Sequence, residues 1–181
     1  MKRWAEILTR VPDARLLLEI FGIDGEDFRR ETEARLTRLG FPLDRVILEP
    51  RKRSNQYILY NKIDLALDPF PFNGGTTTLD ALWMGTPVIT LAGEYFTARM
   101  GVTILNNVGA PELIADDEAA YVDLAVRLAT DPSQLRAVRD GLRQKMAASR
   151  MMDFAAFAGD MEAAYRGMWR RWCANPSAAT A

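Results

Sequence analysis

The segment best suited to chemistry is a glycine- and threonine-rich turn near the middle of the chain. Residues 73–77 read Asn-Gly-Gly-Thr-Thr. Glycines let a backbone approach a ligand closely, and threonines that open a helix combine hydroxyl donors with free N–H groups and the positive end of the helix dipole. Such a helix start binds phosphate. We therefore expect Gly74, Gly75, Thr76 and Thr77 to hold a phosphorylated ligand.

An acidic residue lies one turn into the same expected helix. Asp80 follows Thr76 by four residues, so both lie on one helix face. A carboxylate repels phosphate but can accept hydrogen bonds from ribose hydroxyls, as acidic residues do in dinucleotide folds. The structural alternative is that Thr76 only caps the helix and Asp80 only favours its positive end. No Gly-Lys-Ser/Thr follows the glycines, which excludes a Walker loop.

The densest basic cluster is Arg51-Lys52-Arg53, directly after an expected strand. It can face a nucleotide, or it can be ordinary solvated surface charge. Across the chain, 23 Lys and Arg balance 24 Asp and Glu, giving a net charge of −1. A protein that follows a nucleic-acid backbone normally carries a basic excess, so we expect no nucleic-acid partner.

Two scarcities in the composition exclude other chemistry. The 181 residues contain no histidine, which excludes Ser-His-Asp triads, Cys-His pairs and histidine-based zinc sites. Cys173 is the single cysteine, so no internal disulfide or Cys-x-x-Cys metal site can form. No apolar run approaches the ~20 residues of a bilayer span. We expect a cytoplasmic protein with no metal, no cofactor and no membrane partner.

Short β-rich runs alternate with helical runs, which predicts an α/β fold with a mostly parallel sheet and helices on both faces. Ligands bind such sheets beyond the carboxyl ends of the strands.

A helical C-terminal segment follows, with one apolar stripe from Phe154 to Trp172 that we expect to pack in a core or against another part of the protein. The expected strands are 15–20, 46–48, 63–67, 87–91 and 113–114, and the expected helices are 4–8, 27–39, 54–61, 76–84, 96–107, 117–130, about 135–142 and about 154–172.

The stretch 63–91 resembles the C-terminal catalytic half of the O-GlcNAc transferase / SPINDLY glycosyltransferase family. Its most specific part is Asn-Gly-x-Thr-Thr…Asp…Leu-Trp, within residues 73–83. The resemblance extends from about residue 3 to residue 172, with further matches at 93–94, 98–99, 111–115 and 165–169. It implies the Rossmann-like nucleotide-sugar half of a GT-B fold over residues 1–173, with 174–181 as a disordered tail.

The resemblance also implies roles for the candidate residues. Thr76 and Thr77 would hold the donor diphosphate, and Asp80 would bind the ribose hydroxyls. The loop that carries Arg51 and Arg53 would hold the uracil, mainly through backbone groups.

One position in the base-binding loop departs from the family pattern. Gln56 stands where family members carry a histidine that stacks on the base. Loss of such a stack would weaken binding roughly 10- to 100-fold.

The implied activity is that of an inverting, metal-independent enzyme that transfers GlcNAc from UDP-GlcNAc, or a related nucleotide sugar, to Ser or Thr of acceptor proteins. The family's Gln…Lys segment is absent, so we expect the chain to start inside the domain at Met1. The catalytic residues are left unassigned, and the isolated chain is expected to be inactive. An exposed sheet edge would then favour a homo-oligomer. One alternative is a truncated, non-catalytic nucleotide-binding or interaction module. Another is a UDP-sugar epimerase, and the family matches at Leu82-Trp83 and Met168-Trp169 argue against it.

Overall fold

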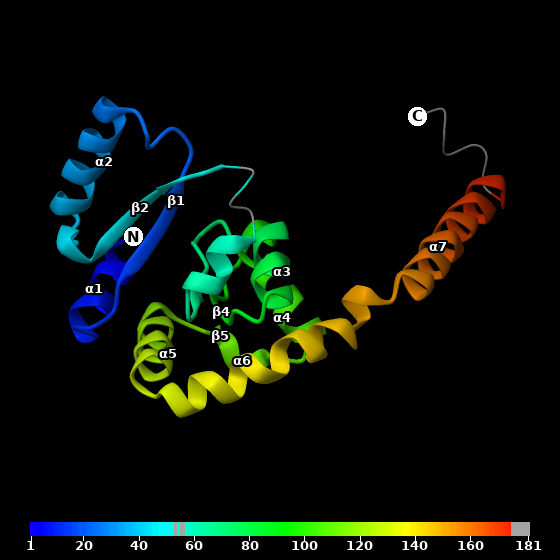
Figure 1. Ribbon diagram of the computed structural model, residues 1–181. Helices are drawn as coiled ribbons and strands as arrows, with labels where there is room; N and C mark the ends of the chain where they lie inside the picture. The colour runs from blue at the N-terminus through cyan, green and yellow to red at the C-terminus, as the bar shows by residue number, and fades with distance from the viewer. Residues whose placement is uncertain (53, 55–56, 175–181) are drawn as a thin grey trace.

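The computed structural model of the protein describes residues 1–52, 54 and 57–174. Parallel strands flanked by helices confirm the expected α/β class (Figure 1). In the described part of the chain the strands are β1 (Leu16–Ile20), β2 (Val46–Pro50), β3 (Ala66–Leu67), β4 (Val88–Leu91) and β5 (Ile114–Ala115). The α-helices are α1 (Lys2–Arg10), α2 (Glu26–Arg38), α3 (Thr76–Trp83), α4 (Met100–Val108), α5 (Glu118–Thr130), α6 (Pro132–Ala147) and α7 (Phe154–Ala174).

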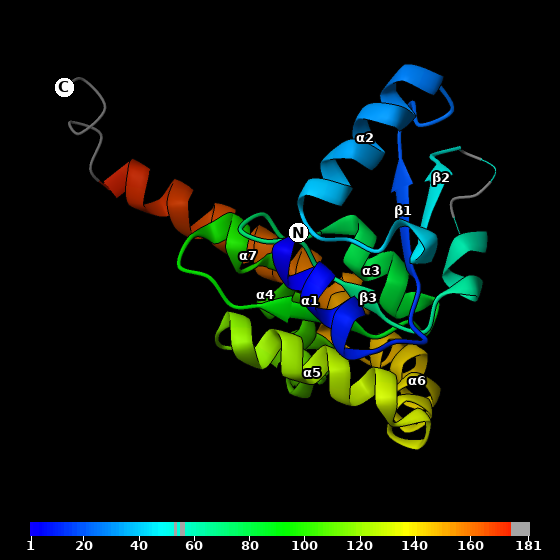
Figure 2. The ribbon, with the colours of Figure 1, turned by 90° about the vertical axis from the view of Figure 1, so that its left-hand side faces the viewer.

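The strands form two sheets, whereas the sequence predicted one. β1 pairs with β2 over five residues, from Leu16 opposite Val46 to Ile20 opposite Pro50. The second sheet has the order β3-β4-β5. Within the described residues no strand lies between β1 and β3, so hydrogen bonding stops there (Figure 2).

Several short elements differ from prediction. The segment predicted as a strand at 63–67 bends at Asp64 and is paired only at β3, and the C=O groups of Ile63 and Asp64 accept from Arg139 of α6 instead of from a strand. The predicted helix at 54–61 lies partly outside the described residues, and its described end is a 3₁₀ helix, η3 (Ile58–Lys62). The predicted helix at 96–107 divides at Arg99 into η4 (Phe96–Ala98) and α4. The remaining 3₁₀ turns are η1 (Leu43–Arg45), η5 (Pro111–Leu113) and η6 (Arg150–Met152).

Most of the core lies around the second sheet. Leu82, Ile89, Leu105 and Tyr121 are fully buried where β4 meets α3, α4 and α5. A smaller cluster lies under the first sheet and contains Ala5, Leu8, Leu36 and Phe41. Each sheet is therefore held mainly by its own helices.

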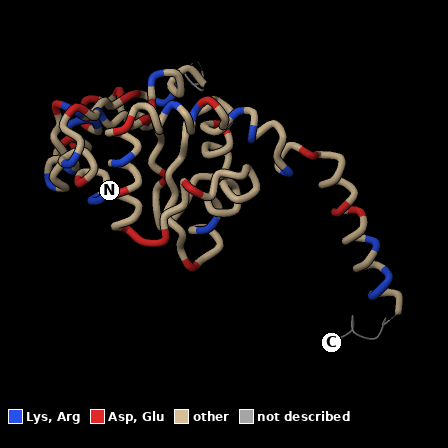
Figure 3. The backbone as a smooth tube through the Cα atoms, turned by 90° about the horizontal axis from the view of Figure 1, so that it is seen from below, with Lys and Arg blue, Asp and Glu red and all other residues tan. Residues whose placement is uncertain are grey.

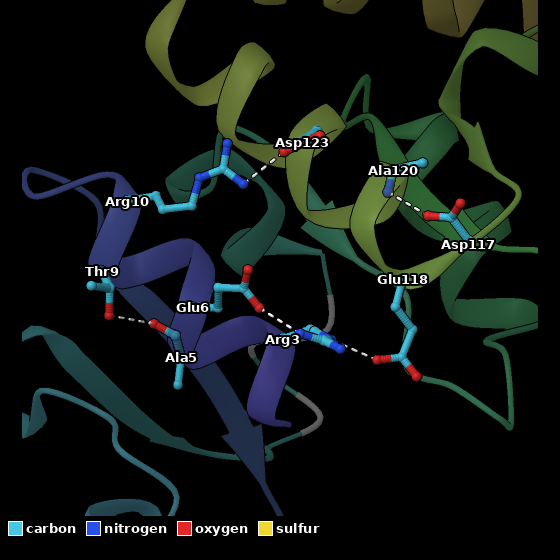
Figure 4. A network of polar contacts seen from close by, with 9 residues as sticks. All are labelled: Arg3, Ala5, Glu6, Thr9, Arg10, Asp117, Glu118, Ala120 and Asp123. Carbon is cyan, nitrogen blue, oxygen red and sulfur yellow. Dashed lines mark hydrogen bonds and ion pairs between the residues drawn. The ribbon is translucent and has the colours of Figure 1, made fainter.

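Helix α1 joins the two clusters. The Trp4 side chain packs against both of them. Polar contacts fix α1 along α5: Arg3 Nε lies 2.5 Å from Glu118 Oε2, and Arg10 pairs with Asp123 (Figure 4). Exposed ion pairs add little stability, so the burial of Ile7 in the main core and the bond from Trp4 to Tyr121 hold α1 in place.

Replacing Tyr121 by phenylalanine is expected to lower the free energy of unfolding by about 1–3 kcal/mol, because a buried C=O and a half-buried indole N–H lose their partner. The Tyr121 hydroxyl accepts from the Trp4 indole N–H at 3.0 Å and donates to the Asp68 C=O at 3.0 Å. Burial raises the pKa of Tyr121. Urea unfolding measures the loss, and Tyr165→Phe on exposed α7 is the control, expected within about 0.5 kcal/mol of the parent. Equal effects of the two variants would contradict the proposed role of the hydroxyl.

Helix α7 projects away from the body of the molecule (Figure 3). The stripe on α7 is not packed in this chain's core, because none of its residues is buried. Phe154, Phe157, Trp169 and Trp172 are all exposed. Within the described residues core packing of the stripe is therefore excluded, and its packing against another part of the protein stays a prediction.

Candidate functional site

A tightly bonded loop joins β3 to α3 at the carboxyl ends of the strands. The loop spans residues 68–75 and includes a cis peptide bond between Phe70 and Pro71. Asn73 is fully buried, with its N–H bonded to the Thr97 C=O at 2.9 Å and its Nδ2 bonded to the Pro69 C=O at 3.2 Å. These bonds fix the backbone just ahead of the two glycines.

The side chain of Asp68 anchors this loop through two hydrogen bonds. Its side chain is 3% exposed. Oδ1 accepts from the Gly74 N–H at 2.6 Å, and Oδ2 accepts from the Thr90 hydroxyl of β4 at 2.6 Å. Burial raises the pKa of Asp68, and the bonds from Thr90 and Gly74 oppose that rise. The sequence analysis did not identify Asp68, although its place directly after a strand was a usable signal.

Gly74 lies where no side chain fits. A Cβ there would be 2.7 Å from Thr78 Oγ1 and 2.8 Å from Thr77 Oγ1. Thr78 is buried, so its hydroxyl has little freedom to move. At Gly75 a Cβ would meet the Met100 methyl at 2.7 Å. The backbone of the turn therefore lies directly against the threonine hydroxyls.

The structure places Thr76 and Thr77 in the first turn of α3, exposed to solvent. No side chain caps this helix. The Gly75 C=O accepts from Thr78 and Leu79, whereas the N–H groups of Thr76 and Thr77 have no protein acceptor within the described residues. Two free amides, two hydroxyls and the helix dipole thus meet at one exposed point, which suits an anion.

Asp80 is half-buried and lies near Tyr60 of η3, a residue that sequence reasoning missed. The Tyr60 hydroxyl donates to the Thr77 C=O at 3.2 Å. Burial is the main cause that raises the pKa of Tyr60 to about 12, with smaller contributions in the same direction from the charges of Asp80 and Glu19 and an opposing one from Arg51. Tyr60 and Glu19 both line the cleft described next.

A cleft of about 280 Å³ lies between the two sheets, and Thr77 is the candidate residue that lines it. Thr77 and Thr78 of α3 line it, as do Asp68 and Tyr60. Arg51 is exposed at the end of β2. The predicted positions Arg53 and Gln56 lie outside the described residues.

Two further findings concern the described residues only. They contain no group of three acidic, cysteine or histidine side chains that could hold a metal ion. Every helix among them is too short or too polar for a bilayer span. Figure 3 shows basic and acidic residues interspersed along the chain.

Comparisons with known proteins agree on one family. The family model described as Glycosyl transferase family 41 matches residues 1–161. A Petunia hybrida protein named "Probable UDP-N-acetylglucosamine--peptide N-acetylglucosaminyltransferase SPINDLY" is 38% identical over 172 residues, which are 94% of this chain and 18% of that protein. A Caenorhabditis elegans UDP-N-acetylglucosamine--peptide N-acetylglucosaminyltransferase is 31% identical over 170 residues, 93% of this chain and 14% of that protein.

A solved structure shares the fold. A mutant of Thermobaculum terrenum O-GlcNAc transferase superposes with a TM-score of 0.89 at 36% identity, covering 97% of this chain and 34% of that one. The chain thus spans less than a fifth of these two curated relatives and about a third of the solved structure.

Proposed function

The chain belongs to glycosyl transferase family 41, and we propose that it is the donor-binding domain of an inverting, metal-independent protein O-glycosyltransferase. Residues 1–173 form this domain, and the donor is UDP-GlcNAc or a related nucleotide sugar. The sugar passes to Ser or Thr of acceptor proteins in the cytoplasm. Because the chain spans a small part of its relatives, the proposal assigns donor binding to it and leaves acceptor binding and transfer unassigned.

The observation that carries the proposal is the exposed start of α3. Its free N–H groups and the hydroxyls of Thr76 and Thr77 offer four donors to a diphosphate without a bound cation. Asp80, one turn deeper, accepts from ribose hydroxyls, and the loop that begins at Arg51, directly after β2, holds the base. In the proposed site, Gly74 and Gly75 bring the backbone up to the phosphates.

Isothermal titration with UDP, GDP and their sugars tests donor binding directly. We expect UDP to bind with an affinity that EDTA leaves unchanged, because no metal mediates the phosphate contacts. GDP binding in place of UDP would redirect the proposal to a guanine nucleotide sugar. Absence of binding to either nucleotide at millimolar concentration would overturn the proposal.

Replacing Thr77 by valine is expected to weaken UDP binding about 10-fold, since one hydrogen bond to a charged group contributes about 1.5 kcal/mol. Valine keeps the β-branched shape, the free N–H and the C=O that Tyr60 uses. Thr103→Val, on an exposed face of α4, is the matched control with unchanged affinity. If Thr103→Val bound UDP as weakly as Thr77→Val, the loss would not come from a specific contact of the Thr77 hydroxyl.

A second candidate is a nucleotide-binding module without transfer activity. The interrupted hydrogen bonding between β1 and β3 favours it, because one wall of the site is open in this chain. Detectable sugar transfer to a peptide by the chain alone would exclude this second candidate.

A further inference from the structure

Asp68 places a buried carboxylate close to the proposed phosphate site. Its side chain is 3% exposed. The two groups that donate to it, the Gly74 N–H and the Thr90 hydroxyl, are both uncharged. Among the described residues, no lysine or arginine forms an ion pair with this carboxylate. A buried charge without a counter-ion is costly, so small changes nearby can shift its protonation.

The carboxylate lies near the hydroxyl that we assign to the diphosphate. A Cβ on Gly74 would be 3.2 Å from Asp68 Oδ1 and 2.8 Å from Thr77 Oγ1. The two oxygens are therefore at most about 6 Å apart, a range over which charges at a partly buried site interact strongly. A diphosphate bonded to the Thr77 hydroxyl would thus disfavour the charged form of Asp68.

The surroundings of Asp68 suit either protonation state. A protonated carboxyl keeps one oxygen as an acceptor and donates through the other. Oδ1 can continue to accept from the Gly74 N–H, while Oδ2–H donates to the Thr90 hydroxyl, which can rotate to accept. A Cβ on Gly101 would lie 2.6 Å from Oδ2, so the first turn of α4 packs directly against this oxygen. Protonation therefore keeps both bonds that hold the turn.

Few other titratable groups surround this carboxylate. Within β4, α4 and the loop up to the glycine pair, no side chain titrates. Arg99, just before α4, is exposed and donates to a backbone C=O. Tyr121 of α5 donates to the Asp68 C=O, and burial raises its pKa, so it stays neutral near pH 7. Glu19 and Tyr60 line the same cleft, and Asp80 lies further along α3.

We propose that Asp68 is a positioning residue of the donor site that takes up a proton from the buffer when the donor diphosphate binds. This inference rests on the proposed function, because the diphosphate supplies the second charge. The bound state then holds the proton more tightly than the free state. Donor affinity is therefore expected to fall, by roughly 10-fold, as pH rises through the pKa of Asp68 in the free chain and then through its higher value in the complex. Burial already raises the pKa of Asp68 in the free chain.

Isothermal titration with UDP-GlcNAc, in buffers with different heats of ionisation, counts the protons taken up. Both phosphates of this ligand are esterified, so the ligand lacks the phosphate proton that titrates near pH 6 in a monoester. The titrations are repeated at stepped pH over the range in which the chain stays folded. We expect uptake of up to about one proton per ligand in the parent and in Asp64→Asn, the exposed control, and none in Asp68→Asn.

The affinities of two Asp68 variants separate positioning from fold stability. Asp68→Asn keeps an acceptor for Gly74 without the charge, so it is expected to bind UDP-GlcNAc independently of pH and more tightly than the parent at the highest pH. Asp68→Ala leaves the Gly74 N–H without its acceptor and is expected to bind more weakly than Asp68→Asn at every pH. If Asp68 acted only through fold stability, neither variant would bind more tightly than the parent at any pH.

The outcomes distinguish this inference from the proposed function. Binding without proton uptake by the parent, at any pH in the range, overturns the inference and leaves the proposed function standing. Uptake that persists in Asp68→Asn also overturns it and assigns the proton to another group, such as Asp80. Absence of binding by the parent overturns both. If Asp68→Asn proves unfolded, the NMR shift of the Asp68 carboxyl carbon in the parent decides: a change toward the protonated form on addition of UDP-GlcNAc supports the inference, and no change overturns it.

Discussion

Replacing Asp68 by alanine is expected to lower the free energy of unfolding by about 2–4 kcal/mol, the largest stability effect we expect. The carboxylate accepts from the Gly74 N–H and from the Thr90 hydroxyl, both at 2.6 Å, in a site that is 3% exposed. Alanine leaves both donors buried without a partner. The loss is smaller than two full hydrogen bonds to a charge because the variant also avoids the burial of that charge.

Two further variants isolate the carboxylate. Asp68→Asn keeps an acceptor for Gly74, and the Thr90 hydroxyl can rotate to accept from the new amide. We therefore expect its free energy of unfolding to lie between those of the parent and the alanine variant. Asp64→Ala removes an exposed carboxylate near the same strand and is expected to change stability by less than about 0.5 kcal/mol. Urea unfolding measures all three. An Asp68→Ala variant as stable as Asp64→Ala would contradict the anchoring role.

The raised pKa of Asp68 also predicts how the free energy of unfolding changes with pH. Its pKa in the folded chain is raised above the ordinary value of 3.8, mainly by burial. The folded state therefore holds this proton more tightly than the unfolded state. The resulting stability is fully present below pH 3.8 and is lost as pH rises through the folded pKa. Comparing the parent with Asp68→Asn cancels the other groups, and the parent's relative stability, measured by urea unfolding, is expected to fall as pH rises from 3.8 through the folded pKa. A relative stability that rises with pH would contradict the raised pKa.

The sequence was enough to predict the order of the elements and the position of the turn. Apolar runs such as 16–20 and the helical spacing of Tyr121, Leu124 and Leu128 are local patterns, and the structure confirms the elements built on them. Thr76 was predicted as the first residue of its helix, and α3 begins there. The local pattern was sufficient here because a glycine pair followed by threonines strongly favours a turn that leads into the first turn of a helix.

Features set by distant contacts could not be predicted in the same way. Asp68 becomes an anchor only because Thr90 and Gly74 converge on it from separate elements. Tyr60 reaches the site because η3 folds back over α3. The break in hydrogen bonding between β1 and β3 depends on how the two sheets are arranged, and the periodicity of either strand does not determine strand order. Periodicity also predicted the apolar stripe of α7 correctly but could not say what covers it.

Replacing Gly74 by alanine is expected to weaken UDP binding about 30- to 100-fold, the largest effect we expect on the proposed donor site, equivalent to about 2–3 kcal/mol. The new Cβ would lie 2.7 Å from Thr78 Oγ1, 2.8 Å from Thr77 Oγ1 and 3.2 Å from Asp68 Oδ1. Thr78 and Asp68 are buried, so the backbone must move and carry the free N–H groups with it. The same overpacking is expected to cost about 1–3 kcal/mol of stability. Titration and urea unfolding measure the two effects.

Two other glycines show whether the effect is specific to the close approach at Gly74. At Gly75 a Cβ meets only the terminal methyl of Met100, which can rotate away, so we expect a smaller loss of affinity than at Gly74. At Gly141, in α6, a Cβ meets nothing within 4 Å. Gly141→Ala is therefore expected to stabilise the helix by about 0.5–1 kcal/mol and to leave affinity unchanged. The expected order of affinity loss, Gly74 above Gly75 above Gly141, follows from what each new methyl group would contact. A larger loss at Gly75 than at Gly74 would mean that the phosphate approaches the turn from the Met100 side instead of along the threonine hydroxyls.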